Sequence, residues 1–390
     1  MANTGRAAPR ELRVVLLTAF DPWAVGNGSS MRARRWCEAL ESCGSLQVRV
    51  VPVVASNSAS PYVRVILPDD DEAARNVAHL MSVRWRDWMV RAAPLPPAAA
   101  SAPAWLGSAL VAELPWKPDV VVAFKMAVAP MAADLAQECG VPLVVDLDDD
   151  EAELARACGD EQAAALERLL QGVGELAVTV TMASPLDAAT VAPRVRAAVQ
   201  VVPNTVELPD LPEAAGMRGR ALYVANFGYR PNREAARWLL DAVVPHIEGL
   251  QQLTLVGALG DRLDAGAPVV ALGRVDDPAT HYRDASVALC PVLTGSGTSI
   301  KVIEAMAHGR AVVTTSVGAR GLGLVPGEHA VVVDHATDFA AAVTRLLADP
   351  DSAAALGIRG RAVVAARYSA AEGVAAMTAA VGAAVGDFGR

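Results

Sequence analysis

The sequence has few aromatic residues, no cysteine pairing pattern and no excess of basic side chains. Phe, Trp and Tyr make up 4% of the 390 residues, so aliphatic side chains must fill the core. The five cysteines are scattered without a CxxC spacing, which argues against a disulfide framework or a zinc site and favours the reducing cytoplasm. Acidic residues (43) outnumber basic ones (34), giving a formal charge of −9. Nucleic-acid partners are therefore not expected, because their binding depends on Lys and Arg.

An unbroken apolar run able to cross a membrane is also missing. The uncharged stretch 92–112 has enough residues to do so, but Pro94, Pro96, Pro97 and Pro103 interrupt it. A linker followed by a helix is expected there instead. The N-terminus has no basic segment followed by an apolar stretch, so we expect no signal peptide and no membrane span.

What the chain does have is an alternation of short β-branched runs with helical stretches. Hydrophobic residues make up 53% of the chain, which excludes disorder. The length of 390 residues suggests about two domains. Alternation of this kind is typical of parallel α/β sheets. The aperiodic stretch 203–219, rich in Pro, Glu and Gly, predicts an interdomain linker. The expected fold class is α/β, with two Rossmann-like parallel-sheet domains facing a cleft in which ligands bind.

The expected elements fall into two series, one on each side of this linker. In the first, strands are expected over 13–18, 48–54, 119–124, 142–147 and 199–202, and helices over 31–42, 131–138 and 151–171. In the second, strands are expected over 221–225, 253–256, 269–272, 287–291, 311–314 and 331–333, and helices over 231–247 and 299–308. Three alanine-rich helices are expected to end the chain.

The segment 294–309, TGSGTSIKVIEAMAHG, carries the strongest chemical signal. It follows a predicted buried strand and begins a helix, where bare backbone at Gly295 and Gly297 and the helix dipole favour an anion. Lys301 lies in the first turn, where its ammonium can reach a phosphate oxygen, and Glu304 can accept hydrogen bonds from a ribose diol. The alternative is an ordinary strand-to-helix turn, capped by Ser or Thr, in which both charges are solvated.

The stretch 271–322 resembles the donor site of retaining GT-B glycosyltransferases of the group 1, family 4-like class. The matching motifs are LGRVDD, a tyrosine-containing helix, GSGT, KVIEAMA, AVVTT and GARGL, and YVANFGYRPN and VPNTV resemble the first donor-domain loop and the hinge. The resemblance is strong after residue 200 and weak before it. It implies an acceptor-side domain over 1–204, a nucleotide-sugar donor domain over 205–366, and a final helix over 367–390 that packs back on the first domain.

The resemblance also implies roles for single residues. Glu304 would bind the ribose, and Lys301 would bind the diphosphate with the backbone of Gly297, Thr298 and Ser299. The further site residues that it implies are Arg274 and Val275 at the base, Gly26 and Gly28 in a loop approaching the donor, Arg230 and Asn232 toward the phosphate or acceptor, and Asp148 on the acceptor side. Lys301 and Arg230 are the catalytic candidates. Two positions depart from the family pattern: Ser296 stands where a first glutamate is usual, and Ala225 where glycine is common.

The acidic run 146–151, DLDDDE, allows two interpretations. Carboxylates at a strand end suit Mg²⁺ or Mn²⁺. Acids at a strand end and in a first helical turn are also favourable through the helix dipole and capping. The second interpretation is preferred, and no metal site is predicted.

The predicted function is retaining, metal-independent transfer of a sugar from a nucleotide sugar to a hydroxyl of a small molecule or glycan. No cofactor is expected beyond the nucleotide sugar, with UDP preferred over GDP. The alternatives are a UDP-sugar epimerase or pseudo-glycosyltransferase of the same fold, and a noncatalytic nucleotide-sugar-binding subunit, which Ser296 keeps open. The alanine-rich composition is typical of a GC-rich bacterial genome, where secondary metabolism or envelope glycan assembly would use such an enzyme. The base, sugar, acceptor and oligomeric state stay open.

Overall fold

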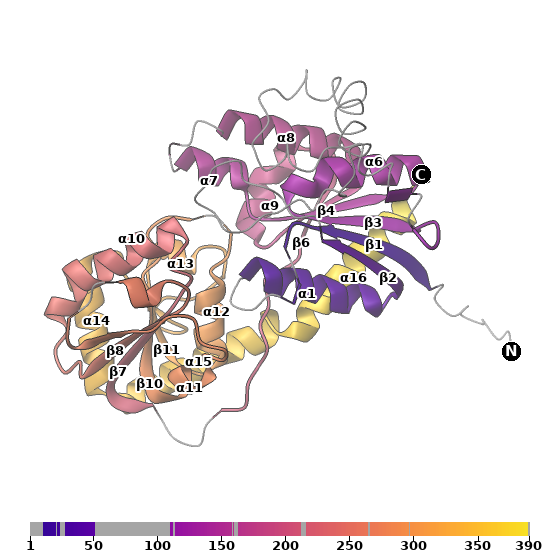
Figure 1. Ribbon diagram of the computed structural model, residues 1–390. Coiled ribbons are helices and arrows are strands. Elements are labelled where there is room, and N and C mark those ends of the chain that lie inside the picture. The colour runs from indigo at the N-terminus through magenta and orange to yellow at the C-terminus, as the bar shows by residue number, and fades with distance from the viewer. Residues whose placement is uncertain are drawn as a thin grey trace, which may run out of the picture.

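The structure, a computed structural model, describes most of the chain as two α/β domains (Figure 1). The described residues are 11–20, 22–23, 28–50, 110–111, 114–157, 159, 163–211, 216–263, 266–295 and 297–388. Two six-stranded sheets lie within them, and every strand pair is parallel. The expected fold class is therefore confirmed. The expected linker over 92–112 lies almost wholly outside the described residues.

The first domain is built from the N-terminal part of the chain and one C-terminal helix. Its strands are β1 (Leu12–Thr18), β2 (Gly44–Val50), β3 (Val120–Phe124), β4 (Leu143–Asp148), β5 (Thr179–Met182) and β6 (Ala198–Val201). Its helices are α1 (Gly28–Glu41), α6 (Ala129–Cys139), α7 (Glu151–Ala157), α8 (Ala163–Leu176), α9 (Pro185–Val191) and α16 (Ala370–Asp387), with 3₁₀ turns over Met126–Val128 and Ala192–Arg194. The strand order is β2-β1-β3-β4-β5-β6.

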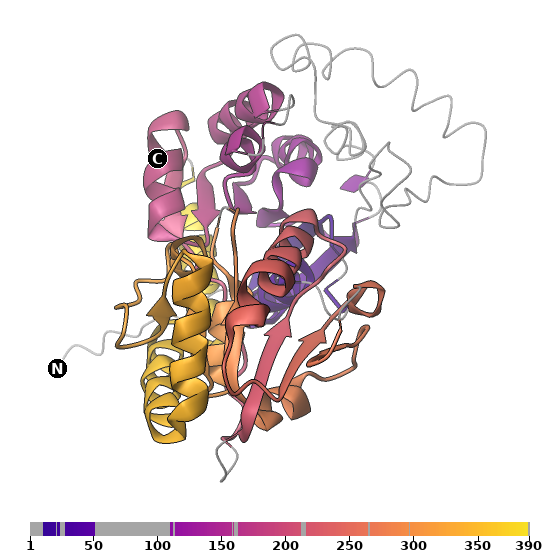
Figure 2. The same ribbon diagram turned by 90° about the vertical axis from the view of Figure 1, so that its left-hand side faces the viewer.

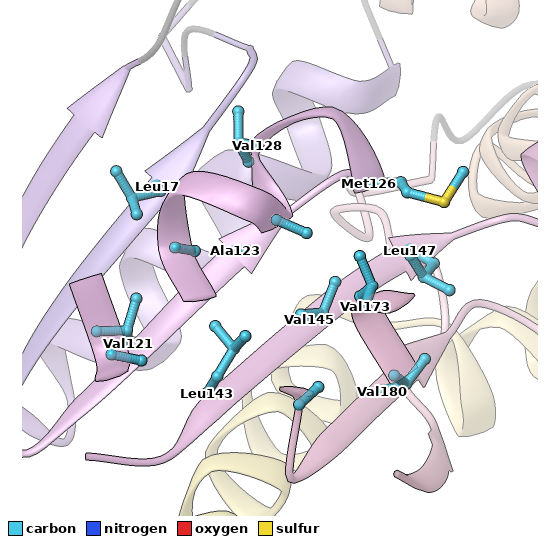
Figure 3. Close-up of a cluster of buried hydrophobic side chains, with 14 of the residues drawn as sticks. Leu17, Val121, Ala123, Met126, Val128, Leu143, Val145, Leu147, Val173 and Val180 are labelled. Atoms are coloured by element: carbon cyan, nitrogen blue, oxygen red, sulfur yellow. The ribbon is translucent and has the colours of Figure 1, made fainter. Parts of the chain in front are cut away.

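Helices cover both faces of this sheet, so its central strands are apolar along their length, as in VVVAF of β3. On one face Leu135 of α6, Val173 of α8 and Val121 of β3 belong to one hydrophobic cluster, in which Figure 3 shows Val121 and Val173. On the other face Trp36 of α1 and Val381 of α16 join one cluster. The last helix of the chain therefore lies beside α1 in the first domain (Figure 1).

The second domain repeats this architecture. Its strands are β7 (Met217–Val224), β8 (Gln252–Val256), β9 (Val269–Ala271), β10 (Ala285–Cys290), β11 (Ala311–Thr314) and β12 (Val331–Val332), in the order β12-β11-β10-β7-β8-β9. Its helices are α10 (Arg230–Trp238), α11 (Ala279–Asp284), α12 (Ile300–Ala307), α13 (Ser316–Ala319), α14 (Ala336–Ala348) and α15 (Pro350–Arg367). A π turn (Leu239–Val243) and 3₁₀ turns (Val244–His246, Gly260–Arg262) complete it.

The two faces of the second sheet are covered by different helices. Ala236 of α10 and Phe339 of α14 pack with Tyr223 on one face. Tyr282 of α11 and Met306 of α12, with residues of α15, pack on the other. Figure 2 shows the two domains stacked one above the other, with the magenta helices of the first above the orange elements of the second. The N-terminal ends of α10 and α12 both follow the carboxyl ends of strands, which places them at one edge of this sheet.

Several expected boundaries are wrong, each for a local reason. The helix expected over 151–171 is two helices, and Gly159 between them has φ 67°, a left-handed conformation that ends a helix. The helix expected over 231–247 changes to a π turn at Leu239 and then to a 3₁₀ turn containing Pro245, because proline lacks the donor that a regular helix needs. The second strand begins at Gly44 instead of Val48, and the expected residues 51–54 lie outside the described part of the chain.

Two further corrections concern segments near the site. The helix after the first glycine loop begins at Gly28, within the expected loop, and not at Met31. The expected linker 203–219 ends in strand, because β7 begins at Met217 and pairs with β10 there. The first residues of β7 are exposed and do not form an apolar run, so the sequence pattern did not predict that the strand begins there. Among the helices that the structure describes, none is long and apolar enough to cross a membrane.

Candidate active site

The candidate site lies where the loops following strands of the two sheets meet. The segment after β10 reaches the first domain, since a Cβ on Gly297 would lie 3.0 Å from the Cβ of Asp149. The segment after β11 does the same, since a Cβ on Gly321 would lie 2.7 Å from the Cβ of Ser184. Ligands bind at the carboxyl ends of parallel strands in such sheets. Loops at this edge of both domains therefore face each other across the expected site.

The loop 297–299 leads into α12 without a side-chain cap. Ser299 is the N-cap residue, but its hydroxyl caps no helical N–H group. The Ser299 Oγ is buried and has no hydrogen-bond partner among the residues that the structure describes. The first N–H groups of a helix also have no acceptor within the helix. Gly297 has φ 71°, which favours glycine and lets the loop lie against Asp149. This helix start has the polarity and open donors that an anion requires.

Lys301 lies in the first turn of α12 and has a neutral partner. Its Nζ donates a hydrogen bond of 2.9 Å to Oδ1 of Asn232 in α10. Burial lowers the pKa of Lys301 from its usual value. Within the part of the chain that the structure describes, no carboxylate forms an ion pair with this ammonium. Lys301 is thus a half-buried cation at a helix N-terminus, and an anion bound there would neutralise it.

Asn232 is held so that its carbonyl oxygen faces Lys301. Its Nδ2 donates to the backbone oxygen of Asn226 at 2.9 Å. Because the amide nitrogen is used in this way, Oδ1 is left to accept from the ammonium. Lys301 and Asn232, both expected site residues, are brought together from helices that follow different strands.

Glu304 lies one turn after Lys301 on α12 and bonds to a tyrosine. The hydroxyl of Tyr282 donates to Oε2 at 3.1 Å, and the Tyr282 ring stacks on His308 with 4.3 Å between centroids. Burial raises the pKa of Glu304, although the Tyr282 hydrogen bond opposes this shift. The second carboxylate oxygen is left to accept from a ligand. The sequence predicted the tyrosine-containing helix, which is α11, but not the hydrogen bond from Tyr282 to Glu304.

The remaining expected site residues are less closely associated. The side chain of Arg230 is 74% exposed and pairs with Glu234 at 2.6 Å. Arg274 is exposed in the loop after β9, whereas Val275 packs against the cluster around Tyr282. Gly28 is the first residue of α1 and lies against the side chain of Ile300 in α12. Gly26 and Ser296 lie outside the described residues.

Asp146, the first acid of the run at the end of β4, is a structural residue. It is fully buried, and the guanidinium of Arg32 donates to both of its oxygens, at 2.7 and 2.8 Å. Trp36 Nε1 at 2.5 Å and Thr181 Oγ1 at 2.8 Å also donate to this carboxylate. With four side-chain donors around it, Asp146 has no free lone pair directed at a ligand. The sequence did not reveal these partners, which come from α1 and β5.

Lys125 is a residue that the sequence analysis missed. Its Nζ lies 2.7 Å from Asp149, 3.2 Å from Asp148 and 3.9 Å from Glu151. Burial opposes the charge of Lys125, but these carboxylates outweigh it and raise its pKa above the usual range. The ammonium is thus the counter-ion of these three carboxylates. Among the described residues, no group of three or more acids, histidines or cysteines is arranged to hold a metal.

The backbone at this cluster is unusual. Lys125 has φ 78° and Asp148 has φ 68°, left-handed conformations that cost energy for residues other than glycine. Each directly follows or ends a buried strand, β3 or β4. Although burial alone would raise the pKa of Asp148, Lys125 and Arg32 lower it overall. A lone lysine directly after an apolar strand was the only signal in the sequence.

Comparison with known proteins supports one family for the second domain. Residues 218–349 match the family described as Glycosyl transferases group 1. No protein with a curated function is similar enough to the sequence to count as a match.

Solved structures with the same fold cover nearly the whole chain. A sucrose-phosphate synthase from Thermosynechococcus elongatus has 21% identity and a TM-score of 0.69, over 95% of this chain and 98% of that one. HepE from Anabaena in complex with UDP-glucose has 12% identity and a TM-score of 0.67, over 95% and 100%. A UDP-forming trehalose-phosphate synthase from Burkholderia xenovorans has 14% identity and a TM-score of 0.60, over 97% and 100%. At these identities the similarity establishes the GT-B fold.

Proposed function

Since residues 218–349 match the family described as Glycosyl transferases group 1, we propose that this GT-B protein moves a sugar from a nucleotide sugar to an acceptor hydroxyl. The observation that carries the proposal is Lys301, a half-buried ammonium with a neutral partner at an uncapped helix start. A diphosphate supplies the negative charge that this position needs. The ribose attached to it would donate to Glu304, one turn further along α12.

The chemical step that we propose uses this charge. As the bond between the sugar and the diphosphate breaks, negative charge grows on the departing phosphate oxygen. Lys301 and the N–H groups at the start of α12 stabilise that charge more strongly than the charge of the bound donor, which lowers the barrier. No metal is needed in this proposal, because Lys301 and the helix dipole provide the positive charge. The carboxylates of the acidic run already have Lys125 and Arg32 as partners.

We propose retention at the anomeric carbon and a UDP-sugar donor. Retention places the acceptor hydroxyl on the face of the sugar from which the diphosphate leaves, so that the departing phosphate oxygen can take the hydroxyl proton. The HepE structure, of the same fold, was determined with UDP-glucose, which supports UDP as the carrier. The acceptor would approach from the first domain, where Asp148 is held by Asn204 at 2.9 Å and by Lys125 at 3.2 Å.

The test is incubation of the full chain with UDP-glucose, UDP-galactose or UDP-N-acetylglucosamine and a panel of sugar, sugar-phosphate and small-molecule acceptors. Released UDP and the anomeric configuration of the product are measured, with and without EDTA. An α-linked product formed equally well in EDTA supports the proposal. Conversion of the donor without an acceptor would indicate an epimerase, and UDP binding without release of product would indicate a binding subunit. Loss of activity in EDTA and recovery with Mn²⁺ would contradict metal independence.

A further inference from the structure

Asn204, which follows β6 after Val202 and Pro203, joins three segments that are distant in the sequence. Only 4% of this residue is exposed. Its Oδ1 accepts from Nη1 of Arg32 in α1 at 3.2 Å. Its Nδ2 donates to Oδ1 of Asp148 at 2.9 Å and to Oγ1 of Thr298 at 3.1 Å. Both hydrogens of the amide nitrogen are therefore used, one within the first domain and one across to the second.

The first-domain side of this arrangement is firmly held. Asp148 also interacts with Lys125 at 3.2 Å, and Arg32 binds Asp146 through two nitrogens. A rotation of the Asn204 amide would break its bonds to both Arg32 and Asp148. The direction of its second N–H is therefore determined by buried charged groups, and that N–H points to Thr298.

The second-domain side is the loop that leads into α12. Thr298 lies between Gly297, which contacts Asp149, and Ser299, the N-cap residue with an unpartnered hydroxyl. Lys301 follows within the first turn. The hydrogen bond from Asn204 thus reaches the loop whose backbone faces the proposed diphosphate, and it can form only when the domains are in contact.

We propose that Asn204 is a positioning residue that holds the loop 297–299 in its diphosphate-binding conformation when the domains are closed. This inference rests on the proposed function. Asn204 acts through the Thr298 hydroxyl, so loss of either group has the same consequence. The loop becomes less ordered, and diphosphate binding must then supply the ordering itself.

The test compares Thr298→Val, which removes the hydroxyl but keeps the side-chain shape, with Thr298→Ser, which keeps an acceptor oxygen. Thr344→Val is the matched control, because the Thr344 hydroxyl accepts from the Glu248 backbone N–H at 3.0 Å, far from this loop in the second domain. Hydrogen exchange of the nucleotide-free protein reports loop order, and calorimetry reports UDP affinity. Thr298→Val should speed exchange at 297–301 and weaken UDP about 3- to 10-fold, the range for one hydrogen bond. Thr298→Ser should lose less UDP affinity than Thr298→Val, and Thr344→Val should change neither the exchange rate at 297–301 nor the UDP affinity.

A double-mutant cycle with Asn204→Ala decides whether Thr298 acts through Asn204. If it does, Thr298→Val causes no further loss of UDP affinity in the Asn204→Ala background. If the two losses multiply, Thr298 contacts the ligand directly and the inference is wrong. Asn204→Ser, which keeps a polar group at this buried position but is too short to span to Thr298, replaces Asn204→Ala if melting shows that the latter does not fold. Unchanged exchange in Thr298→Val would overturn the inference even if the wild type bound no UDP, whereas absent UDP binding alone would overturn the proposed function.

Discussion

The ammonium of Lys301 lies 2.9 Å from Oδ1 of Asn232, and this pair links the N-terminal ends of α12 and α10. The environment of Lys125 on the first domain is the opposite, with three carboxylates within 4.0 Å. Burial works against the charge of both lysines, but the pKa of Lys301 is lowered whereas that of Lys125 is raised. Lys125 is thus neutralised by the protein itself, and Lys301 is left for a ligand.

Replacement of Lys301 should slow the chemical step more than it weakens donor binding. We predict that Lys301→Ala lowers kcat by about 10²-fold or more and raises the donor KM less, because charge on the diphosphate grows in the transition state. Steady-state kinetics with melting temperatures measure this. Lys117→Ala, at an exposed lysine of the first domain, is the control and should behave as wild type. Near-normal kcat in Lys301→Ala would mean that this lysine is only a solvated helical charge.

UDP binding should weaken at alkaline pH, beginning below the usual lysine pKa of about 10.4. Burial lowers the pKa of Lys301 in the free protein, and bound diphosphate favours the protonated form. Binding therefore takes up a proton wherever the pH exceeds the lowered pKa, and affinity falls there. Calorimetry between pH 7 and 10 tests this. In Lys301→Arg the loss should disappear over this range, because guanidinium stays charged. The same pH dependence in both proteins would assign it to another group.

Glu304 should determine recognition of the ribose, whose charge does not change in the reaction. We predict that Glu304→Gln raises the donor KM about tenfold with little change in kcat, as expected when an interaction equal in ground and transition states is lost. The wild type should prefer UDP to 2′,3′-dideoxy-UDP, and Glu304→Gln should lose most of this preference. The control is Glu328→Gln, at a carboxylate whose side chain is 58% exposed. Unaltered discrimination in Glu304→Gln would place the ribose elsewhere.

Removal of Lys125 should destabilise the protein more at pH 8 than at pH 5. The Lys125 side chain is 10% exposed, and loss of one partner from a buried ion pair costs about 3 kcal/mol. In Lys125→Met the folded-state pKa values of Asp149 and Glu151, which already lie above their usual values, rise further. Stability is then lost as the pH increases through that window. Burial already raises the pKa of Glu151 to about 7 despite Lys125. Chemical denaturation at the two pH values measures the free energy of unfolding, with Lys117→Met as the control. An equal loss of this free energy at pH 5 and pH 8 would contradict the role of Lys125 as counter-ion of these carboxylates.

Much of the fold could be predicted from the sequence, because each central strand is a short apolar run between helices. The donor segment could also be predicted, because Gly297, Lys301 and Glu304 are close together in the sequence and follow a predicted strand. The helix break near Gly159 was not predicted, because a single glycine within a helical pattern is tolerated and does not by itself end a helix.

The polar network between the domains was not predictable, because its members come from separate segments. Asp146 could be interpreted as a metal ligand only while Arg32, 114 positions away, was unknown as its partner. Asn204 belongs to a stretch that was interpreted as a linker, yet it is buried and bonded to Thr298, 94 positions away. Distances in space of this kind are set by packing, which a local pattern does not record.

The most direct test of diphosphate recognition at α12 is calorimetric titration of wild type and Lys301→Ala with UDP and with uridine. We predict that wild type binds UDP at least tenfold more tightly than uridine, since the diphosphate neutralises the half-buried ammonium. In Lys301→Ala this difference should largely vanish, while uridine affinity is retained. Equal binding of UDP and uridine by wild type, or an undiminished preference for UDP in Lys301→Ala, would contradict the account.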